Sequence, residues 1–163
     1  RIIEDKERIQ WFASKQVNAK DIFFIGRGID YAISLEGSLK MKEISYIHSE
    51  AYAAGELKHG TIALIEEGTV VVALCTVKNL FDKMLSNIKE VKARGAVVIA
   101  VAEEGHTEIE KEADYVIYLP KCDELVMPSE VVVPLQLFSY YVSSLKGLDI
   151  DKPRNLAKSV TVE

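Results

Sequence analysis

Short runs of consecutive apolar residues constrain the fold of this chain more than any other feature. Four such runs are separated by longer stretches: Ile22–Ile25, Val70–Leu74, Ala96–Ala102 and Tyr115–Leu119. A strand with one face in water alternates apolar and polar residues, so a continuous apolar run predicts a strand that is buried on both faces. Because stretches with helical spacing lie between the runs, we predict an α/β fold. The expected architecture is a flavodoxin-like three-layer sandwich, with helices covering both faces of a parallel sheet.

The stretches around these runs carry the spacing and the terminal residues of helices. We expect helices over residues 1–18, 30–48, 80–94 and 128–146. Gly95 follows the third helix at the position where a left-handed residue usually ends a helix. Pro134 lies inside the fourth helix, where it either kinks the helix or moves its start. We divide the chain into a lead-in helix (1–18), one domain (19–148) and a polar C-terminal tail (149–163).

The size and charge of the chain exclude several classes of protein. With 163 residues, 48% of them apolar, the chain has the length of one globular domain and too much apolar content for disorder. Its 20 Lys and Arg against 25 Asp and Glu include no basic cluster, which argues against nucleic acid as a partner. No apolar run approaches the ~20 residues that span a bilayer, so we expect no membrane partner. Cys75 and Cys122 form no Cys-x-x-Cys motif, and without a signal peptide the cytoplasm is the expected compartment.

The motif Gly26-Arg27-Gly28 lies where the first strand is expected to end. Open α/β sheets bind ligands at this edge, beyond the carboxyl ends of their strands. The motif lacks the third Gly and the acidic residue of a dinucleotide-binding fingerprint, and the chain has no Gly-Lys-Ser or Gly-Lys-Thr phosphate loop. We therefore favour a tight strand-to-helix turn over a cofactor site.

The helix that begins near Asp30 carries a charged face. Glu36, Lys40 and Glu43 fall within about 60° of one another at 100° per residue. The other side, expected to face the core, carries Ala32, Leu35 and Leu39. The charged residues fit a solvated face with ion pairs worth ~0.2–0.5 kcal/mol. They also fit a carboxylate beside an ammonium that moves protons between adjacent carbons; spacing favours the solvated face but does not decide between the two interpretations.

Two of the three histidines, His48 and His59, lie in a connection of small and polar residues. An accessible His can titrate near neutral pH and serve as a base. The two are 11 residues apart with no companion ligand at metal-binding spacing, so we expect no metal site. His106 lies in an acidic loop and is expected to be plain surface.

The tail would usually be dismissed as a frayed terminus. However, Lys158 is flanked by Ala157, Ser159 and Val160, and a Lys folded among such residues loses proton affinity. A neutral amine is what condensation with a carbonyl requires. By composition alone, a frayed terminus remains the simpler interpretation.

Four stretches together resemble the glucosamine-6-phosphate synthase family, the isomerising glutamine:fructose-6-phosphate aminotransferases. These stretches are Phe24–Gly28, Leu35–His48, Glu50–Gly60 and Lys152–Glu163. The resemblance covers the whole chain and corresponds to the second of two sugar-isomerase (SIS) domains, with residues 149–163 as an active-site tail. The first three stretches are shared in looser form by other SIS proteins, and the Pro-Arg-Asn-Leu-Ala-Lys-Ser-Val-Thr-Val-Glu ending is specific to the synthase. Thr61 stands where the family usually has Pro, which we expect to alter loop stiffness rather than chemistry.

The resemblance implies roles for four catalytic positions. His59 matches the base that opens the ring of fructose 6-phosphate and is supplied by the neighbouring subunit of a homodimer. Lys158 matches the lysine that forms a Schiff base with the opened ketose. Glu43 matches the base that carries a proton between carbons 1 and 2, and Lys40 tunes the charge of Glu43.

The resemblance also implies the substrate contacts and the partners. Arg154, Asn155 and Ser159 belong to a mobile tail that closes over the sugar phosphate. No metal or organic cofactor is implied, because the imine acts as the electron sink. The phosphate-binding loop belongs to the first SIS domain, and ammonia comes from a glutaminase domain. Since the chain begins at Arg1 rather than Met, we expect a segment of the longer enzyme that is inactive alone.

Two other functions fit an SIS domain. One is a non-catalytic module that binds a phosphosugar and regulates a partner. The other is a different sugar-phosphate isomerase or deglycase. The joint presence of Glu43, His59 and Lys158 favours the amidotransferase, because a pure binder has no use for a tail amine and a proton shuttle.

Overall fold

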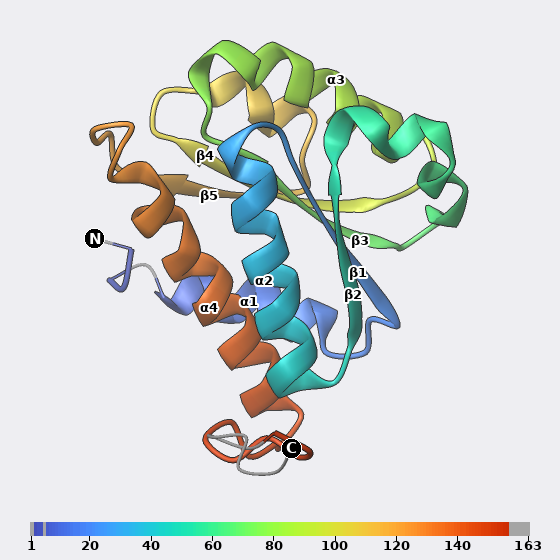
Figure 1. Cartoon of the computed structure of the whole chain (residues 1–163), viewed down its shortest axis with the longest axis vertical. Coiled ribbons are helices and arrows are strands. Elements are labelled where there is room, and N and C mark those ends of the chain that lie inside the picture. The colour runs from blue at the N-terminus through green and yellow to red at the C-terminus, as the bar shows by residue number, and fades with distance from the viewer. Residues whose placement is uncertain (1, 5, 157–163) are drawn as a thin grey trace, which may run out of the picture.

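A computed structural model describes residues 2–4 and 6–156 and shows five parallel strands in one sheet (Figure 1). In sheet order, the strands are β2 (His48–Ala53), β1 (Asp21–Gly26), β3 (Val70–Cys75), β4 (Val97–Glu103) and β5 (Tyr115–Leu119). The 2-1-3-4-5 order is that of a flavodoxin-like fold, in which the chain reverses direction across the sheet between β1 and β3. The predicted α/β architecture is confirmed.

Helices cover both faces of the sheet. One face carries α1 (Lys6–Gln16), α2 (Ile29–Ser45) and α4 (Met127–Leu145), and the other carries α3 (Phe81–Lys92) (Figure 1). Short 3-10 helices lie in the connections: η1 (Ala54–His59), η2 (Thr61–Leu64), η3 (Lys78–Leu80) and η4 (Thr107–Lys111). Among the helices of the described part of the chain, none has the length and apolar character to cross a bilayer.

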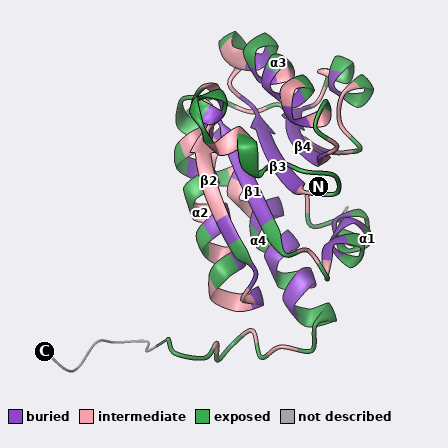
Figure 2. Cartoon of the chain, turned by 90° about the vertical axis from the view of Figure 1, so that its right-hand side faces the viewer, coloured by how far each residue is buried: buried purple, intermediate pink, exposed green. Residues whose placement is uncertain are grey.

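The core lies on both sides of the sheet, and adjacent residues of a strand pack into opposite layers. Phe24 packs with α1, α2 and α4, whereas Phe23 packs with the residues beneath α3. The central strands β1, β3 and β4 are buried apart from the first residue of β1 and of β4, and Figure 2 shows most of their length in purple. This two-sided burial explains why the central strands read as continuous apolar runs.

The structure confirms one predicted helix end and corrects another. Gly95 follows α3 with φ +86°, the left-handed conformation that its position predicts. Pro134 is buried inside α4, which continues through it from Met127 to Leu145. The helix expected over 30–48 ends earlier, at Ser45, because Tyr46 adopts a left-handed conformation with φ 60°.

The fifth strand, β2, was wrongly expected to be a connection. Its sequence, His-Ser-Glu-Ala-Tyr-Ala, has no apolar run because β2 lies at the edge of the described sheet, where its one neighbouring strand among the described residues is β1. The pairing is parallel and runs from Asp21 opposite His48 to Gly26 opposite Ala53. An edge strand with partly exposed residues carries too weak an apolar signal for recognition from sequence.

The expected core face of α2 is also wrong. Leu35 and Leu39 are 49% and 42% exposed and Ala32 is exposed, whereas Ser34, Gly37 and Ser38 are buried. Small residues face the core because α2 lies close to its neighbours: a Cβ at Gly37 would lie 2.9 Å from Leu135 Cδ1. The buried hydroxyls cost little, because each finds a backbone oxygen as its partner; Ser34, for example, donates to the carbonyl of Asp30 at 2.8 Å.

Candidate functional site

Glu43 lies in the last turns of α2, where that helix meets the tail. A hollow of about 270 Å³ opens there, lined by Leu39, Lys42, Glu43, Tyr46, Arg154, Asn155 and Leu156. Three residues singled out from the sequence, Glu43, Arg154 and Asn155, therefore share one surface although more than a hundred positions separate the first from the other two. The hollow lies at the amino edge of the sheet, opposite to the edge at which the Gly26–Gly28 loop lies.

The tail is attached to α2 through Tyr46. The backbone N–H of Arg154 donates a hydrogen bond to the Tyr46 hydroxyl at 2.9 Å, and the Arg154 guanidinium lies 4.2 Å from the centre of the Tyr46 ring. The left-handed backbone of Tyr46 ends α2 and directs its side chain toward the tail. Asn155 also has a positive φ, of 61°, so the chain turns at this point.

Lys40 lies between two carboxylates on the exposed side of α2. Its Nζ atom lies 2.8 Å from Glu43 Oε2 and 3.6 Å from Glu36 Oε1. The hydrogen bond to Glu43 is the main cause that raises the pKa of the Lys40 ammonium above its usual value. Lys40 is thus held in its charged form beside the Glu43 carboxylate, the arrangement expected if Lys40 adjusts the charge of a neighbouring base.

His59 lies far from Glu43 in the same chain. It ends η1, which follows β2, whereas α2 ends before β2 begins (Figure 1). The six residues of β2 separate these two ends by roughly 20 Å at about 3.3 Å per residue. The His59 side chain is exposed at the carboxyl edge of the sheet, at the opposite end of β2 from Glu43 of the same chain. Thr61 begins η2 two positions later.

Two predicted site residues lie outside the described residues. Lys158 and Ser159 both follow Leu156, the last residue of the tail that the structure describes. The described tail ends within the hollow that holds Glu43.

The Gly26–Gly28 loop is the tight strand-to-helix turn that the sequence favours. Gly28 has φ +61°, and a Cβ at Gly26 would lie 2.5 Å from the Asp30 backbone. The side chain of Arg27 binds other parts of the chain: its Nε donates to Asn87 Oδ1 at 3.0 Å, and its guanidinium packs against Gly55. The loop therefore holds α3 and η1 in place.

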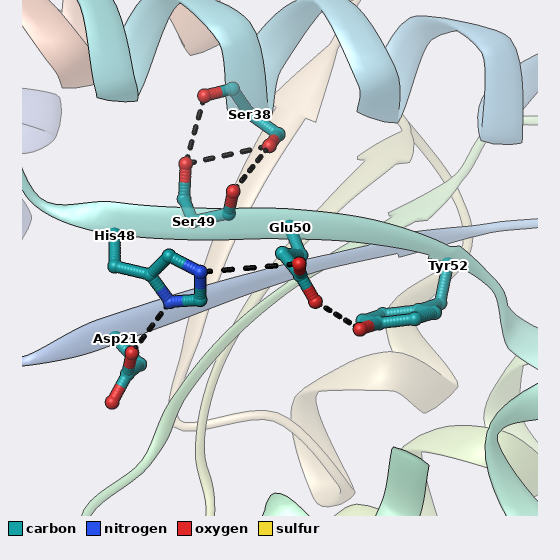
Figure 3. A network of polar contacts seen from close by, with 6 residues as sticks. All are labelled: Asp21, Ser38, His48, Ser49, Glu50 and Tyr52. Atoms are coloured by element: carbon teal, nitrogen blue, oxygen red, sulfur yellow. Dashed lines mark hydrogen bonds and ion pairs between the residues drawn. The ribbon is translucent and has the colours of Figure 1, made fainter. Parts of the chain in front are cut away.

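Sequence reasoning missed a polar network on β2, because it missed the strand. His48, Glu50 and Tyr52 alternate along one face of β2 (Figure 3). His48 Nδ1 lies 2.7 Å from Asp21 Oδ1, and the Tyr52 hydroxyl donates to Glu50, which raises the pKa of Tyr52. These residues extend along the outer strand away from the hollow.

The other face of β2 is fastened to α2. Ser38 Oγ donates to the Ser49 carbonyl at 3.0 Å, and Ser49 Oγ donates to the Ser38 carbonyl at 2.7 Å (Figure 3). This reciprocal pair, which is fully buried, fixes the edge strand beneath the helix that carries Glu43.

Two further expectations from the sequence concern a metal site and the exposure of His106. Across residues 2–4 and 6–156, no group of three His, Cys, Asp or Glu side chains is arranged to hold a metal ion. His106 is only partly exposed, since its ring stacks on Phe81 with ring centres 4.1 Å apart.

Comparison with known proteins places these features in a family. A family model for the SIS domain matches residues 17–146. A protein of Caldanaerobacter subterraneus named glutamine–fructose-6-phosphate aminotransferase (isomerizing) is 62% identical over 162 residues, covering 99% of this chain and 27% of that protein. The chain thus spans 27% of the length of the curated relatives that it matches at about this identity.

Solved structures show the same similarity. The C-terminal domain of glucosamine-fructose-6-phosphate aminotransferase from Francisella tularensis superposes with a TM-score of 0.85 at 37% identity, covering 93% of this chain and 43% of that chain. A glucosamine-6-phosphate deaminase from Thermotoga maritima superposes with a TM-score of 0.71 at 28% identity, covering 96% of this chain and 46% of that chain.

Proposed function

Since this chain belongs to the SIS domain family, we propose that it is the second isomerase domain of an isomerising glutamine:fructose-6-phosphate aminotransferase. The longer enzyme would convert fructose 6-phosphate and glutamine-derived ammonia into glucosamine 6-phosphate in the cytoplasm. Its first SIS domain and its glutaminase domain would supply the phosphate site and the ammonia. The observation that carries this proposal is the hollow in which Glu43 lies beside Arg154 and Asn155.

Glu43 is the proposed proton carrier of the reaction. In the step from fructosimine to aminoaldose, its carboxylate removes a proton from carbon 1 and returns one to carbon 2. Lys40 stays protonated beside it and stabilises the charge of the base. The hollow is shallow and lies open at the end of α2, so a sugar held against it by a second domain can reach Glu43.

Lys158 and the tail would complete the site. Lys158 follows Leu156, at the hollow, by two positions, and two steps of extended chain span at most about 7 Å. This short distance along the chain supports the proposal that the Lys158 amine would form the Schiff base with the ketose. Arg154, Asn155 and Ser159 would contact the substrate from the same tail.

The position of His59 supports a homodimer as the proposed assembly. In one chain His59 and Glu43 lie at opposite ends of β2, so a reaction that needs both requires His59 from a second subunit. That residue would open the ring of the incoming sugar before the tail amine condenses with it.

The test is the exchange of the carbon-1 proton with solvent in the longer enzyme. Glu43→Gln should reduce this exchange by about 10²–10⁴-fold while glutamine hydrolysis continues, because only the base is lost. Glu36→Gln is the matched control, since Glu36 also faces Lys40 but does not line the hollow. Exchange that survives Glu43→Gln, or falls equally in Glu36→Gln, would contradict the assignment.

A second experiment examines Lys158. Borohydride reduction of the enzyme with fructose 6-phosphate should attach one hexose phosphate to the tail peptide. Lys158→Arg keeps the positive charge but removes the condensing amine, so the label should disappear. A label that persists in this variant would show that another amine forms the Schiff base.

A further inference from the structure

A second and larger cavity lies at the opposite edge of the sheet from Glu43. Its volume is about 550 Å³, and it is lined by Ile29, Thr76, Val77, Lys78, Asn79, Glu103, Glu124, Leu125, Met127 and Pro128. These residues come from the start of α2, the ends of β3 and β4, and the start of α4. This edge, next to the point where the strand order reverses, is where flavodoxin-like sheets bind their ligands.

Two successive backbone N–H groups that such a site would offer to an anion, those of Thr76 and Val77, already have a partner. Asp30, in the first turn of α2, is 1% exposed. Its Oδ2 atom accepts the backbone N–H of Thr76 at 2.8 Å and that of Val77 at 3.3 Å, and its Oδ1 atom accepts the Thr76 hydroxyl at 2.5 Å. Successive N–H groups that converge beside a helix N-terminus are the usual receptor for a phosphate or carboxylate.

The charged side chains that line the cavity add to the same effect. Glu103 is 3% exposed and lines the cavity, with the Lys78 ammonium 3.7 Å away as its ion-pair partner. Glu124 also lines the cavity. Carboxylates thus outnumber the ammonium, and the partly enclosed space is unfavourable for a phosphate dianion.

We propose that Asp30 is the built-in occupant of the anion site at the carboxyl edge, so that this domain is closed to phosphate there. A carboxylate held in the same chain competes at an effective concentration far above that of a free metabolite. The phosphate of a sugar is then directed to another part of the longer protein, and this domain keeps only its Glu43 hollow for the sugar. The proposal goes beyond the assigned reaction and rests on the packing of Asp30.

The experiment is an amide chemical-shift titration of the 163-residue chain with inorganic phosphate. In the unaltered chain, the Thr76 and Val77 amides should not shift saturably. Asp30→Ala removes the carboxylate and frees both N–H groups, so these amides should shift and saturate with an affinity on the order of tenfold or more above that of the unaltered chain.

Two further variants distinguish the effect of an Asp30 side chain bonded to the Thr76 and Val77 amides from the effect of its negative charge. Asp82→Ala makes the same change in net charge in the exposed first turn of α3, and its Thr76 and Val77 amides should not respond to phosphate. Asp30→Asn removes the charge but leaves an oxygen against the amides, so it should gain less affinity than Asp30→Ala.

Three results would overturn the proposal. The first is saturable shifts of the Thr76 and Val77 amides in the unaltered chain, which remain measurable even if Asp30→Ala fails to fold. The second is a folded Asp30→Ala variant that gains no phosphate binding. The third is equal gains in Asp30→Ala and Asp30→Asn, which would mean that charge alone excludes the anion. None of these readouts depends on catalysis, so they are separate from the tests of Glu43 and Lys158.

Discussion

Arg154 and Tyr46, 108 positions apart in the chain, hold the C-terminal tail against the end of α2. The guanidinium of Arg154 lies over the Tyr46 ring, and the Arg154 backbone N–H donates to the Tyr46 hydroxyl. A cation over an aromatic ring contributes about 0.5–1 kcal/mol at an exposed site. Together with one hydrogen bond, this contact is strong enough to bias the position of the tail and weak enough to let it move.

Changing Tyr46 should therefore affect the tail before it affects the fold. Tyr46→Phe removes the hydroxyl acceptor but keeps the ring, so we expect faster hydrogen exchange at the Arg154 amide and a small loss of activity in the longer enzyme. Tyr46→Leu also removes the ring and should reduce activity further, mainly through a higher KM for fructose 6-phosphate. Unchanged Arg154 exchange in both variants would show that Tyr46 does not hold the tail.

Glu43 and His59 should complement each other between subunits. Glu43→Gln and His59→Ala homodimers should each be nearly inactive in the longer enzyme. A mixed dimer has one site that combines Glu43 from one subunit with His59 from the other, so mixing the two variants under subunit exchange should restore synthesis of glucosamine 6-phosphate. No recovery in verified mixed dimers would place both residues in the same chain's site or give His59 another role.

Gly37→Ala should destabilise the domain although alanine is the better helix former. A Cβ at this position would lie 2.9 Å from Leu135 Cδ1 and 3.0 Å from Phe24 Cε1, so overpacking should cost about 1–3 kcal/mol in urea unfolding. The helix-propensity gain of roughly 1 kcal/mol offsets only part of this cost. In a Leu135→Ala background the closest contact of the added methyl is removed while that with Phe24 remains, so the penalty should shrink; an equal penalty in both backgrounds would contradict this explanation.

Asp30 should make stability fall with rising pH in the acid range. Burial raises the pKa of Asp30 above its ordinary value of 3.8, against the opposing effect of its hydrogen bonds with Thr76 and Val77. The folded chain therefore holds the Asp30 proton more tightly than the unfolded chain does. The stabilisation from this proton is complete below about pH 3.8 and is lost as pH rises through the folded-state pKa.

Asp30→Asn is the reference for that measurement, because asparagine does not titrate. The unfolding free energy of the unaltered chain minus that of Asp30→Asn should decrease as pH rises through this window and then stay level. An increase across the same window would mean that the hydrogen bonds outweigh burial at Asp30.

The two cysteines should differ in their reaction with a thiol reagent. Cys75 is 1% exposed inside β3, and burial raises the pKa of its thiol well above the usual range. Cys122 is partly exposed, with a raised pKa, and should react more slowly than a free thiol but far faster than Cys75. Folded protein should thus show one fast-reacting thiol that Cys122→Ser removes; a fast phase that persists in this variant would place Cys75 within reach of solvent.

The sequence by itself determined the layers of this fold. Phe23 and Phe24 are neighbours that pack into opposite cores, and only a strand covered on both sides accepts such a pair. Gly95 marked the end of α3 for a local reason, since a left-handed residue favours glycine. Periodicity and helix ends depend on contacts within a few residues, and so they can be read along the chain.

Tertiary structure alone decided which face of α2 is buried and which residues meet. Ser34 and Ser38 look polar in sequence, but hydrogen bonds to backbone oxygens satisfy them, and they face the core in place of Leu35 and Leu39. The edge strand β2 has too few apolar residues to be recognised as a strand from the sequence.

In the candidate site, too, the sequence named residues, and only the tertiary structure showed where they lie relative to one another. The resemblance named Glu43 and His59, but only the path of β2 places them at opposite ends of the sheet. The contact of Arg154 with Tyr46 and that of Asp30 with Thr76 likewise join residues 108 and 46 positions apart. Such pairings depend on how whole elements pack together, because no local pattern records which distant donor a carboxylate or an aromatic ring will find.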